Sequence, residues 1–261
     1  MKPELVTLVL DAAVKAGIAI LEVYKSPFAV EHKDDKSPLT LADKNAHKII
    51  THMLKDTGIP VLSEEGKVIP YEERSAWNEL WIVDPLDGTK EFIRRNGEFT
   101  VNIALVRDGI SVFGVIYQPV PDLLYYGSVG SSAFKVENAS LKSKIQLTGD
   151  SVKLDSTKLP DTYTVVASRS HLSPETSAFI EDARTLHGSV ECISSGSSLK
   201  LCMIAEGKAH IYPRFAPTME WDIAAGHAIV KAAGKNVYAN STGEELRYNK
   251  PDLLNDWFIA K

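Results

Sequence analysis

Apolar positions near the start of the chain recur with the period of α-helices. In residues 3–24 they lie three and four positions apart, the spacing that lines one helical face. These positions are Leu5, Leu8, Val9, Ala12, Ala16, Ala19 and Val23. A second run with this period begins at Thr40, after the polar loop 33–38, and stops at Gly58. We therefore expect two helices. Charges within the first run argue against a signal peptide.

Short apolar runs bounded by turn residues predict strands in the following part of the chain. They cover residues 59–62, 80–83, 99–106 and 110–117. The last two are joined by Asp108-Gly109, a strong hairpin signal, and a meander to about residue 134 follows. The first two runs, 59–62 and 80–83, are followed by acidic residues. The pattern indicates an antiparallel-rich sheet with acidic side chains at two strand ends.

Strands and helices alternate in the second half. Strands are predicted at 163–167, 190–193 and 209–212, and helices at 174–186, 197–206 and 222–233. The polar stretch 140–161 is the best candidate boundary, which divides the chain into an α+β half, 1–150, and an α/β half, 151–261. The interleaving predicts a mixed α/β fold in layers.

The amino-acid composition bears on which ligands the protein can bind and on the cellular compartment in which it works. The 261 residues carry 29 basic and 34 acidic side chains, a net charge of −5, so we expect no broad binding of a nucleic acid polymer. An anionic ligand then needs a local positive site. The two cysteines, Cys192 and Cys202, form no metal-finger or redox spacing, which favours a reducing compartment and a cytoplasmic location.

The segment 81–92, WIVDPLDGTKEF, carries the most chemistry. Asp84 and Asp87 follow an apolar run, and together with the Leu86 carbonyl they offer the oxygen ligands that Mg²⁺ prefers. Gly88 and Thr89 would expose free N–H groups to a phosphate if a helix opens at the next residue. The plain alternative is a polar turn with a helix cap.

Three more carboxylates stand at comparable positions. Glu64 follows the run 59–62, with a solvated charge pair as the alternative. Asp222 precedes a predicted helix, where it serves as an N-cap, a metal ligand or both. Asp43 lies three residues after Thr40, either as its capping partner or as a base.

Together these residues resemble the lithium-sensitive, magnesium-dependent phosphomonoesterases that include the inositol monophosphatases. The resemblance spans nearly the whole chain and rests on Asp43 in TLAD, Glu64 in LSEE, DPLDGT at 84–89 and Asp222 in WD. Further strings resemble the bacterial adenosine 3′,5′-bisphosphate nucleotidases of that family: LDGTKEFI at 86–93, RNGEFTVN at 95–102, GSSLK at 196–200 and YPRF at 212–215. Inositol monophosphatases usually have Gly-Thr-Asn-Phe where this chain has GTKEF.

The resemblance implies an α-β-α-β-α sandwich with the site between its halves. It implies that Glu64, Asp84 and the Leu86 carbonyl hold one Mg²⁺, that Asp84, Asp87 and Asp222 hold a second, and that a third, weaker ion lies beside Glu64. The first half is then the metal-binding half, and the second adds one ligand and the substrate loops. Thr89 and Asp43 would orient and deprotonate a water.

The implied reaction removes the 3′-phosphate of adenosine 3′,5′-bisphosphate (PAP) to give AMP and phosphate, in support of sulfate assimilation and PAP recycling. The expected substrate contacts are Gly88, Thr89, Lys90, Ser168, Arg169, Gly196, Ser197, Lys200, Arg214 and Asp222. Lys200 and Arg214 are the first candidates for the non-reacting phosphate, with Arg94 and Arg95 as further nearby cations. Peripheral association with the inner membrane is an open possibility, as is the oligomeric state.

Other functions compete with this one. An inositol-1-phosphate phosphatase and a non-catalytic, cation-dependent binding module fit the same fold. A phosphatase with an aspartyl nucleophile would carry Asp-x-Asp-Gly-Thr, whereas Asp84 and Asp87 have two residues between them. Comparing phosphate release from PAP with release from inositol 1-phosphate separates the nucleotidase from the inositol-1-phosphate phosphatase.

Overall fold

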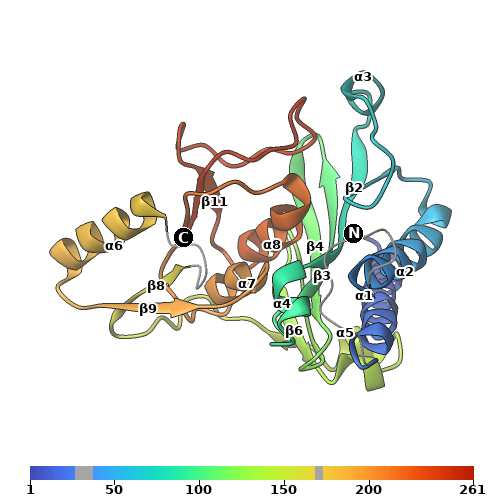
Figure 1. Ribbon diagram of the computed structural model, residues 1–261, viewed down its shortest axis with the longest axis horizontal. Helices are drawn as coiled ribbons and strands as arrows, with labels where there is room; N and C mark the ends of the chain where they lie inside the picture. Colours follow the sequence, from blue (N-terminus) through green and yellow to red (C-terminus); the bar gives the residue numbers. More distant parts are fainter. Residues whose placement is uncertain (27–37, 168–172) are drawn as a thin grey trace.

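The computed structural model describes residues 1–26, 38–167 and 173–261. Figure 1 shows its elements stacked in layers, with α1 and α2 at one side, α7 and α8 in the middle and α6 at the far side. A seven-stranded sheet lies on one side of the middle helices, and two smaller sheets lie on the other. The predicted fold class, an α-β-α-β-α sandwich, is therefore confirmed.

The larger sheet has seven strands in chain order. They are β1 (Val61–Ser63), β2 (Glu79–Asp87), β3 (Thr100–Arg107), β4 (Ile110–Gln118), β5 (Leu123–Ser128), β6 (Ala133–Glu137) and β7 (Val152–Lys153). β1 runs parallel to β2, and the other neighbours are antiparallel. Asp108 and Gly109 both have positive φ in the β3–β4 turn, which matches the twist of a tight hairpin.

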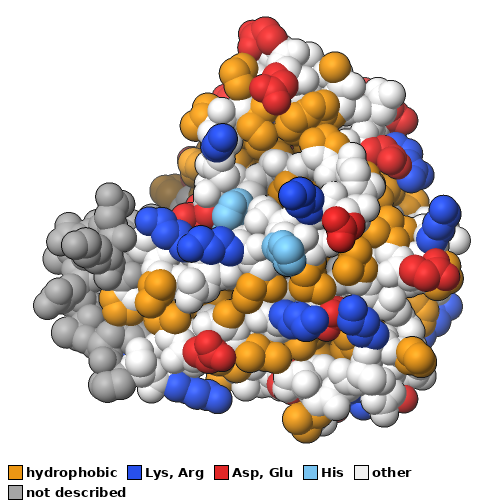
Figure 2. Space-filling model, turned by 90° about the vertical axis from the view of Figure 1, so that its right-hand side faces the viewer, with side chains coloured by type: hydrophobic (Ala, Val, Ile, Leu, Met, Phe, Trp, Pro, Cys, Tyr) orange, Lys and Arg blue, Asp and Glu red, His pale blue; other side chains and the backbone are white. Residues whose placement is uncertain are grey.

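Two helices cover one face of this sheet. α1 (Pro3–Tyr24) packs on α2 (Pro38–Leu54), and both contact the sheet. Their buried stripe is part of an apolar core that includes the fully buried Trp81 and Phe92. The outer surface on this side mixes acidic and basic side chains (Figure 2). No helix in the described part of the chain is long and apolar enough to cross a membrane.

The helix α8 (Glu220–Ala232) covers the opposite face and is buried along most of its length. It approaches β4 so closely that a Cβ at Gly114 would lie 2.1 Å from the Ala225 carbonyl oxygen, so only glycine fits there. α7 (Leu199–Ala205) packs beside α8. This close contact fixes the N-terminal turn of α8 above the larger sheet.

The second half adds smaller sheets and the outer helix. β8 (Tyr163–Ala167) pairs in parallel with β9 (Val190–Ser194), and β10 (Tyr212–Arg214), β12 (Phe258–Ala260) and β11 (Val237–Ala239) form an antiparallel set. A Val165–Ile211 bridge joins the two groups, and α6 (Pro174–His187) packs on β8 and β9. Short helices complete the chain: η1 (Lys55–Thr57), α3 (Tyr71–Arg74), α4 (Thr89–Ile93), η2 (Ala139–Leu141) and α5 (Gln146–Gly149).

Most predicted elements are present, with shifted ends. α2 begins at Pro38 rather than at Thr40, α7 begins at Leu199, and β10 starts only at Tyr212, where 209–212 was expected. β2 continues through Asp87, although a strand ending at Val83 was predicted. The loop 33–37 lies outside the described residues.

Candidate active site

A β-bulge at the end of β2 brings Asp84 and Asp87 together. Asp84 pairs with Asn102 and Asp87 with Thr100, so three steps along β2 match two along β3. Residues three apart in a regular strand point to opposite faces, and the extra residue cancels that alternation. Pro85, within the bulge, has no N–H to give to the ladder. Both carboxylates can therefore serve one site.

Asp222 joins them from α8. One carboxylate oxygen each from Asp84, Asp87 and Asp222 can be chosen so that all lie within 4.8 Å of one another. Asp222 was expected just before its helix; it lies instead in the first turn, where its Oδ2 accepts the Met219 N–H at 2.8 Å. That hydrogen bond fixes the carboxylate on a rigid, buried helix end.

Charge repulsion and burial act together on this group. Burial raises the pKa of Asp84, and the charges of Asp87, Glu64, Asp222 and Asp43 raise it further, in that order. Burial, followed by the charge of Asp87, likewise raises the pKa of Asp222, to about 7. Oxygen ligands that repel one another so strongly suit a hard divalent cation, whose charge would compensate theirs.

Glu64 and Asp43 border the group from two other elements. Glu64 directly follows β1, where its N–H donates to the Val83 carbonyl at 3.1 Å, and its side chain is exposed. It is not one of the three clustered carboxylates, although its charge reaches both Asp84 and Asp222. Asp43 is 7 % exposed in the interior of α2, beyond the first turn, which excludes the predicted capping position.

The turn after β2 is shaped by its backbone. The Leu86 N–H donates to Asp84 Oδ1 at 3.0 Å. Gly88 has φ +95°, and a Cβ there would lie 3.2 Å from both the Glu98 carbonyl oxygen and the Phe99 Cα, so the turn requires glycine. Thr89 is the first residue of α4, one residue before the helix start expected at Lys90.

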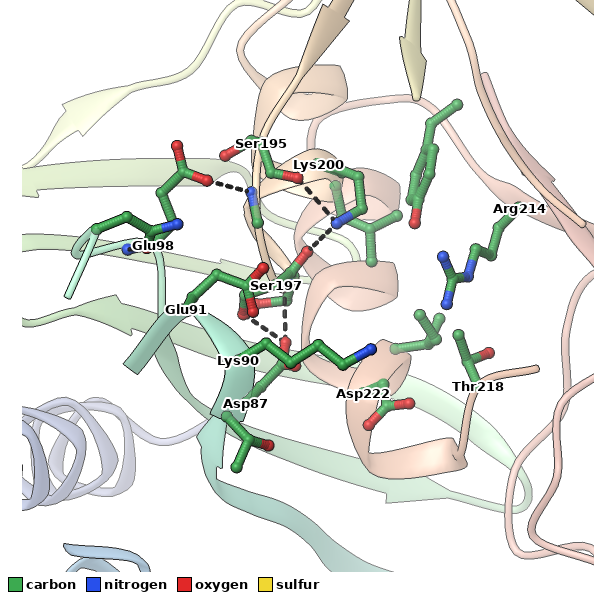
Figure 3. A pocket seen from close by; sticks show the side chains of 18 of the residues that line it. Asp87, Lys90, Glu91, Glu98, Ser195, Ser197, Lys200, Arg214, Thr218 and Asp222 are labelled. Atoms are coloured by element: carbon green, nitrogen blue, oxygen red, sulfur yellow. Dashed lines mark hydrogen bonds between the residues drawn. The ribbon is translucent and has the colours of Figure 1, made fainter. Parts of the chain in front are cut away.

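A pocket of about 470 Å³ opens beside the carboxylates (Figure 3). Asp87 and Asp222 lie at one side of it, and Lys200 and Arg214 lie at another. Eight predicted substrate contacts line it: Gly88, Thr89, Lys90, Gly196, Ser197, Lys200, Arg214 and Asp222. The pocket therefore combines an acidic end with a basic end.

The basic end combines a buried lysine with a half-buried arginine. Lys200 is 7 % exposed, and its Nζ donates to the carbonyls of Ser195 at 3.1 Å and Ser197 at 2.6 Å. Burial lowers the pKa of Lys200 to about 8, against the attraction of Asp87. Arg214 donates to the Pro217 carbonyl, and its buried Nε has no hydrogen-bond partner within the described structure. Such donors favour an anionic ligand.

Comparison with known proteins identifies the family. The model of the inositol monophosphatase family matches residues 2–257. The chain belongs to the inositol monophosphatase family. Its members are metal-dependent, which agrees with the acidic cluster. Curated relatives in this family include the 3′(2′),5′-bisphosphate nucleotidase CysQ of Salmonella typhimurium, 44 % identical over 96 % of each chain, and that of Escherichia coli K12, 43 % identical with the same coverage.

Solved structures of the inositol monophosphatase family show the same fold. CysQ from Bacteroides thetaiotaomicron is 53 % identical, covers 97 % of this chain and 95 % of its own, and has a TM-score of 0.92. An inositol monophosphatase from Zymomonas mobilis has a TM-score of 0.75 at 22 % identity, with 97 % and 90 % covered, so it supports the fold alone. The CysQ relatives confirm the branch inferred from the sequence, that of the bacterial bisphosphate nucleotidases.

Some predicted contacts fall outside the described residues, and some residues of the pocket were not predicted. Ser168 and Arg169 lie outside the described residues. The lining residues that were not predicted include five polar ones, Glu91, Glu98, Ser195, Ser198 and Thr218. Four of these stand beside predicted contacts or within the strings that indicated the family branch, so their neighbours along the chain were the available signal.

Proposed function

We propose that the chain is a Mg²⁺-dependent 3′(2′),5′-bisphosphate nucleotidase that converts PAP to AMP and phosphate. One observation carries the proposal: the clustered carboxylates share one pocket with two cations, the buried Lys200 and the half-buried Arg214. A substrate with one reacting and one non-reacting phosphate needs both features. The identity of 44 % to a CysQ nucleotidase over nearly the whole chain supports the choice of substrate.

The carboxylates form the metal-binding end. We assign Glu64, Asp84 and the Leu86 carbonyl to one Mg²⁺ and Asp84, Asp87 and Asp222 to a second, with room for a weaker third ion beside Glu64. Bound there, Mg²⁺ supplies charge compensation for the phosphate oxygens and lowers the pKa of a bound water. Without ions, the repulsion among these side chains would favour an expanded site.

Thr89 and Asp43 complete the proposed catalytic set. Thr89 lies two residues after Asp87 and lines the pocket, so its hydroxyl can hold the attacking water. Asp43 is buried close enough to raise the pKa of Asp84, so it can accept a proton passed through the Thr89 hydroxyl. A Thr hydroxyl both donates and accepts, which this transfer requires.

The basic end would hold the non-reacting phosphate. Lys200 and Arg214 are its main contacts, Lys90 is a further one at the pocket wall, and Gly88, Gly196 and Ser197 shape the wall. The family resemblance adds Ser168 and Arg169, which follow β8 in the sequence and lie outside the described residues. We further propose that the chain consists of two halves, divided near residue 150, and that the site lies between them. Sulfate assimilation and PAP recycling remain the proposed role in the cell.

Phosphate release tests the proposal. With Mg²⁺ present, we expect kcat/KM for PAP to exceed that for inositol 1-phosphate, and Asp84→Asn to abolish release. Equal or greater release from inositol 1-phosphate would favour the other branch of the family. Unchanged release by Asp84→Asn would show that the acidic cluster is not the catalytic centre.

A further inference from the structure

A polar cluster lies behind Asp87, and its hydrogen bonds to Asp87 are not used in the function proposed above. The Asp87 network consists of Thr100, Asn102, Ser197 and Ser198, from β3 and from the loop before α7. Asp87 Oδ2 accepts the Ser198 N–H at 2.7 Å, the Asn102 Nδ2 at 3.3 Å and the Ser197 hydroxyl. Within the described chain, these bonds go to Oδ2 and leave Oδ1 for another partner.

The Asn102 amide has a fixed direction. Asn102 is fully buried, and its Oδ1 accepts a hydrogen bond from the Ser198 hydroxyl at 2.8 Å and lies 3.0 Å from the Thr100 hydroxyl. A carboxylate can only accept, so the amide must turn its Nδ2 toward Asp87. Turning the amide over would face two oxygens together and leave buried groups unsatisfied.

The hydroxyl protons of the Asp87 network can also be placed consistently. Thr100 Oγ1 lies 2.6 Å from Ser197 Oγ, which itself donates to Asp87. If Thr100 donates to Ser197 and Ser198 donates to Asn102, every series of donors ends on the Asp87 carboxylate. The network thus presents only donors to Asp87 Oδ2 and holds the carboxylate in one orientation.

The same loop binds Lys200. The Lys200 Nζ donates to the Ser195 and Ser197 carbonyls, and the Gly196 N–H donates to Glu98 at 2.9 Å (Figure 3). Ser197 has φ +53°, a left-handed conformation that a non-glycine residue adopts only where its surroundings hold it. The hydrogen bonds to Asp87 from residues 197 and 198 supply that support.

We propose that the Asp87 network is a positioning device that orients Asp87 for the cation and couples cation binding to the order of residues 195–198, the loop that precedes α7 and holds Lys200. Rotation of the Asp87 carboxylate would break bonds from Asn102 and from the loop together. Without a cation, the charges of Asp84 and Asp222 repel Asp87. A bound cation draws Asp87 into one position and thereby orders the loop that carries the Lys200 contacts.

Two variants remove hydroxyls from the network. Thr100→Val replaces a fully buried hydroxyl by a methyl group of similar size, and Thr100→Ser restores the hydroxyl. Ser197→Gly removes the hydroxyl that donates to Asp87 and suits the positive φ, so this variant is expected to fold even if Thr100→Val does not. Ser156→Ala is the control, because it loses a buried hydroxyl bond, to the Ala233 carbonyl, away from the site.

Both readouts use Mg²⁺ alone, without nucleotide. Calorimetry gives the Mg²⁺ affinity, and we expect Thr100→Val and Ser197→Gly to lower it by about 10-fold or more, while Thr100→Ser and Ser156→Ala keep it. Hydrogen exchange of the amides 195–200 reports loop order. Mg²⁺ should slow this exchange about fivefold or more in the wild type and the controls, and much less in the two variants.

Two results would overturn the proposal: wild-type Mg²⁺ affinity in both Thr100→Val and Ser197→Gly, or equal slowing of loop exchange in every protein. The inference rests on the metal-binding part of the proposed function. A wild type that shows Mg²⁺-dependent loop protection but releases no phosphate from PAP would refute the nucleotidase and support the network.

Discussion

Removing one charge from the acidic cluster should stabilise the protein without Mg²⁺ and weaken its response to Mg²⁺. Asp222→Asn is the cleanest change, because an Asn oxygen can still accept the Met219 N–H that Asp222 accepts now. Burial and Asp87 raise the pKa of Asp222 to about 7, so its charged form is disfavoured at neutral pH. Neutral Asn avoids that penalty.

The expected magnitude follows from ligand linkage. Mg²⁺ at 100 times its dissociation constant adds about 2.7 kcal/mol to the free energy of unfolding. For a chain of this length, about 2–4 °C in Tm accompanies each kcal/mol, so the wild type should gain roughly 5–11 °C. Asp222→Asn should start from a higher Tm without Mg²⁺ and gain clearly less.

The pH dependence has a definite sign. Carboxyls whose pKa is raised in the folded state bind more protons there than when unfolded, so they lower stability as pH rises from about 4 toward 7. The Mg²⁺-free protein should therefore lose Tm over this range, and the gain from Mg²⁺ should be larger at pH 8 than at pH 5. Asp222→Asn should reduce both trends.

Differential scanning calorimetry at pH 5 and 8, with and without Mg²⁺, measures all of these values. Asp182→Asn, an equal charge change at an exposed position on α6, is the control and should behave as the wild type does. A lower Mg²⁺-free Tm for Asp222→Asn together with an undiminished gain from Mg²⁺ would refute the reasoning.

Three other changes test separate residues. Lys200→Met should raise KM for PAP by roughly 10- to 100-fold, because it removes a charge-assisted contact of about 1.5–3 kcal/mol, whereas the control Lys208→Met should leave KM unchanged. Steady-state kinetics measure both values. An unchanged KM in Lys200→Met would show that Lys200 does not contact the phosphate. Thr89→Val should lower kcat by about 10²- to 10⁴-fold with little change in KM, and Thr89→Ser should recover much of it; equal kcat for Val and Ser would exclude the hydroxyl. Burial lowers the pKa of His227 to about 4, so the unfolded chain takes up a proton there first, and the contribution of His227 to stability should fall as pH drops from about 6.5 to 4, opposite in sign to the contribution of Asp84 and Asp222. The difference in unfolding free energy between the wild type and His227→Gln, measured in a urea-denaturation pH series, should therefore decrease over this range. A difference that does not change with pH would contradict this assignment.

Local patterns predicted the elements well where they had strong signals. α1 runs from Pro3 to Tyr24 as its apolar period indicated, and the Asp108-Gly109 hairpin lies where its turn residues placed it. β10 was misplaced by a few residues, because its position depends on pairing with β12, which is distant in sequence. Strand ends set by such long-range pairing leave little trace in local periodicity.

The sequence indicated part of the candidate site as a list of residues, but not its geometry. The side-chain types of Asp84, Asp87 and Asp222 indicated metal chemistry from the sequence. The bulge that turns the first two toward one site depends on the register with β3, and the contact with the third depends on the packing of α8 against β4. Thr100 and Asn102 read simply as polar positions in a strand, since their partners lie some 100 residues away along the chain.

A crystal grown with Mn²⁺ in place of Mg²⁺ and with AMP tests the central claim most directly. Anomalous scattering should place Mn²⁺ at roughly 2–2.3 Å from oxygens of Asp84, Asp87 and Asp222, and the AMP phosphate should contact Lys200 and Arg214. Ions bound away from these three carboxylates, or an AMP phosphate that contacts neither cation, would contradict the account.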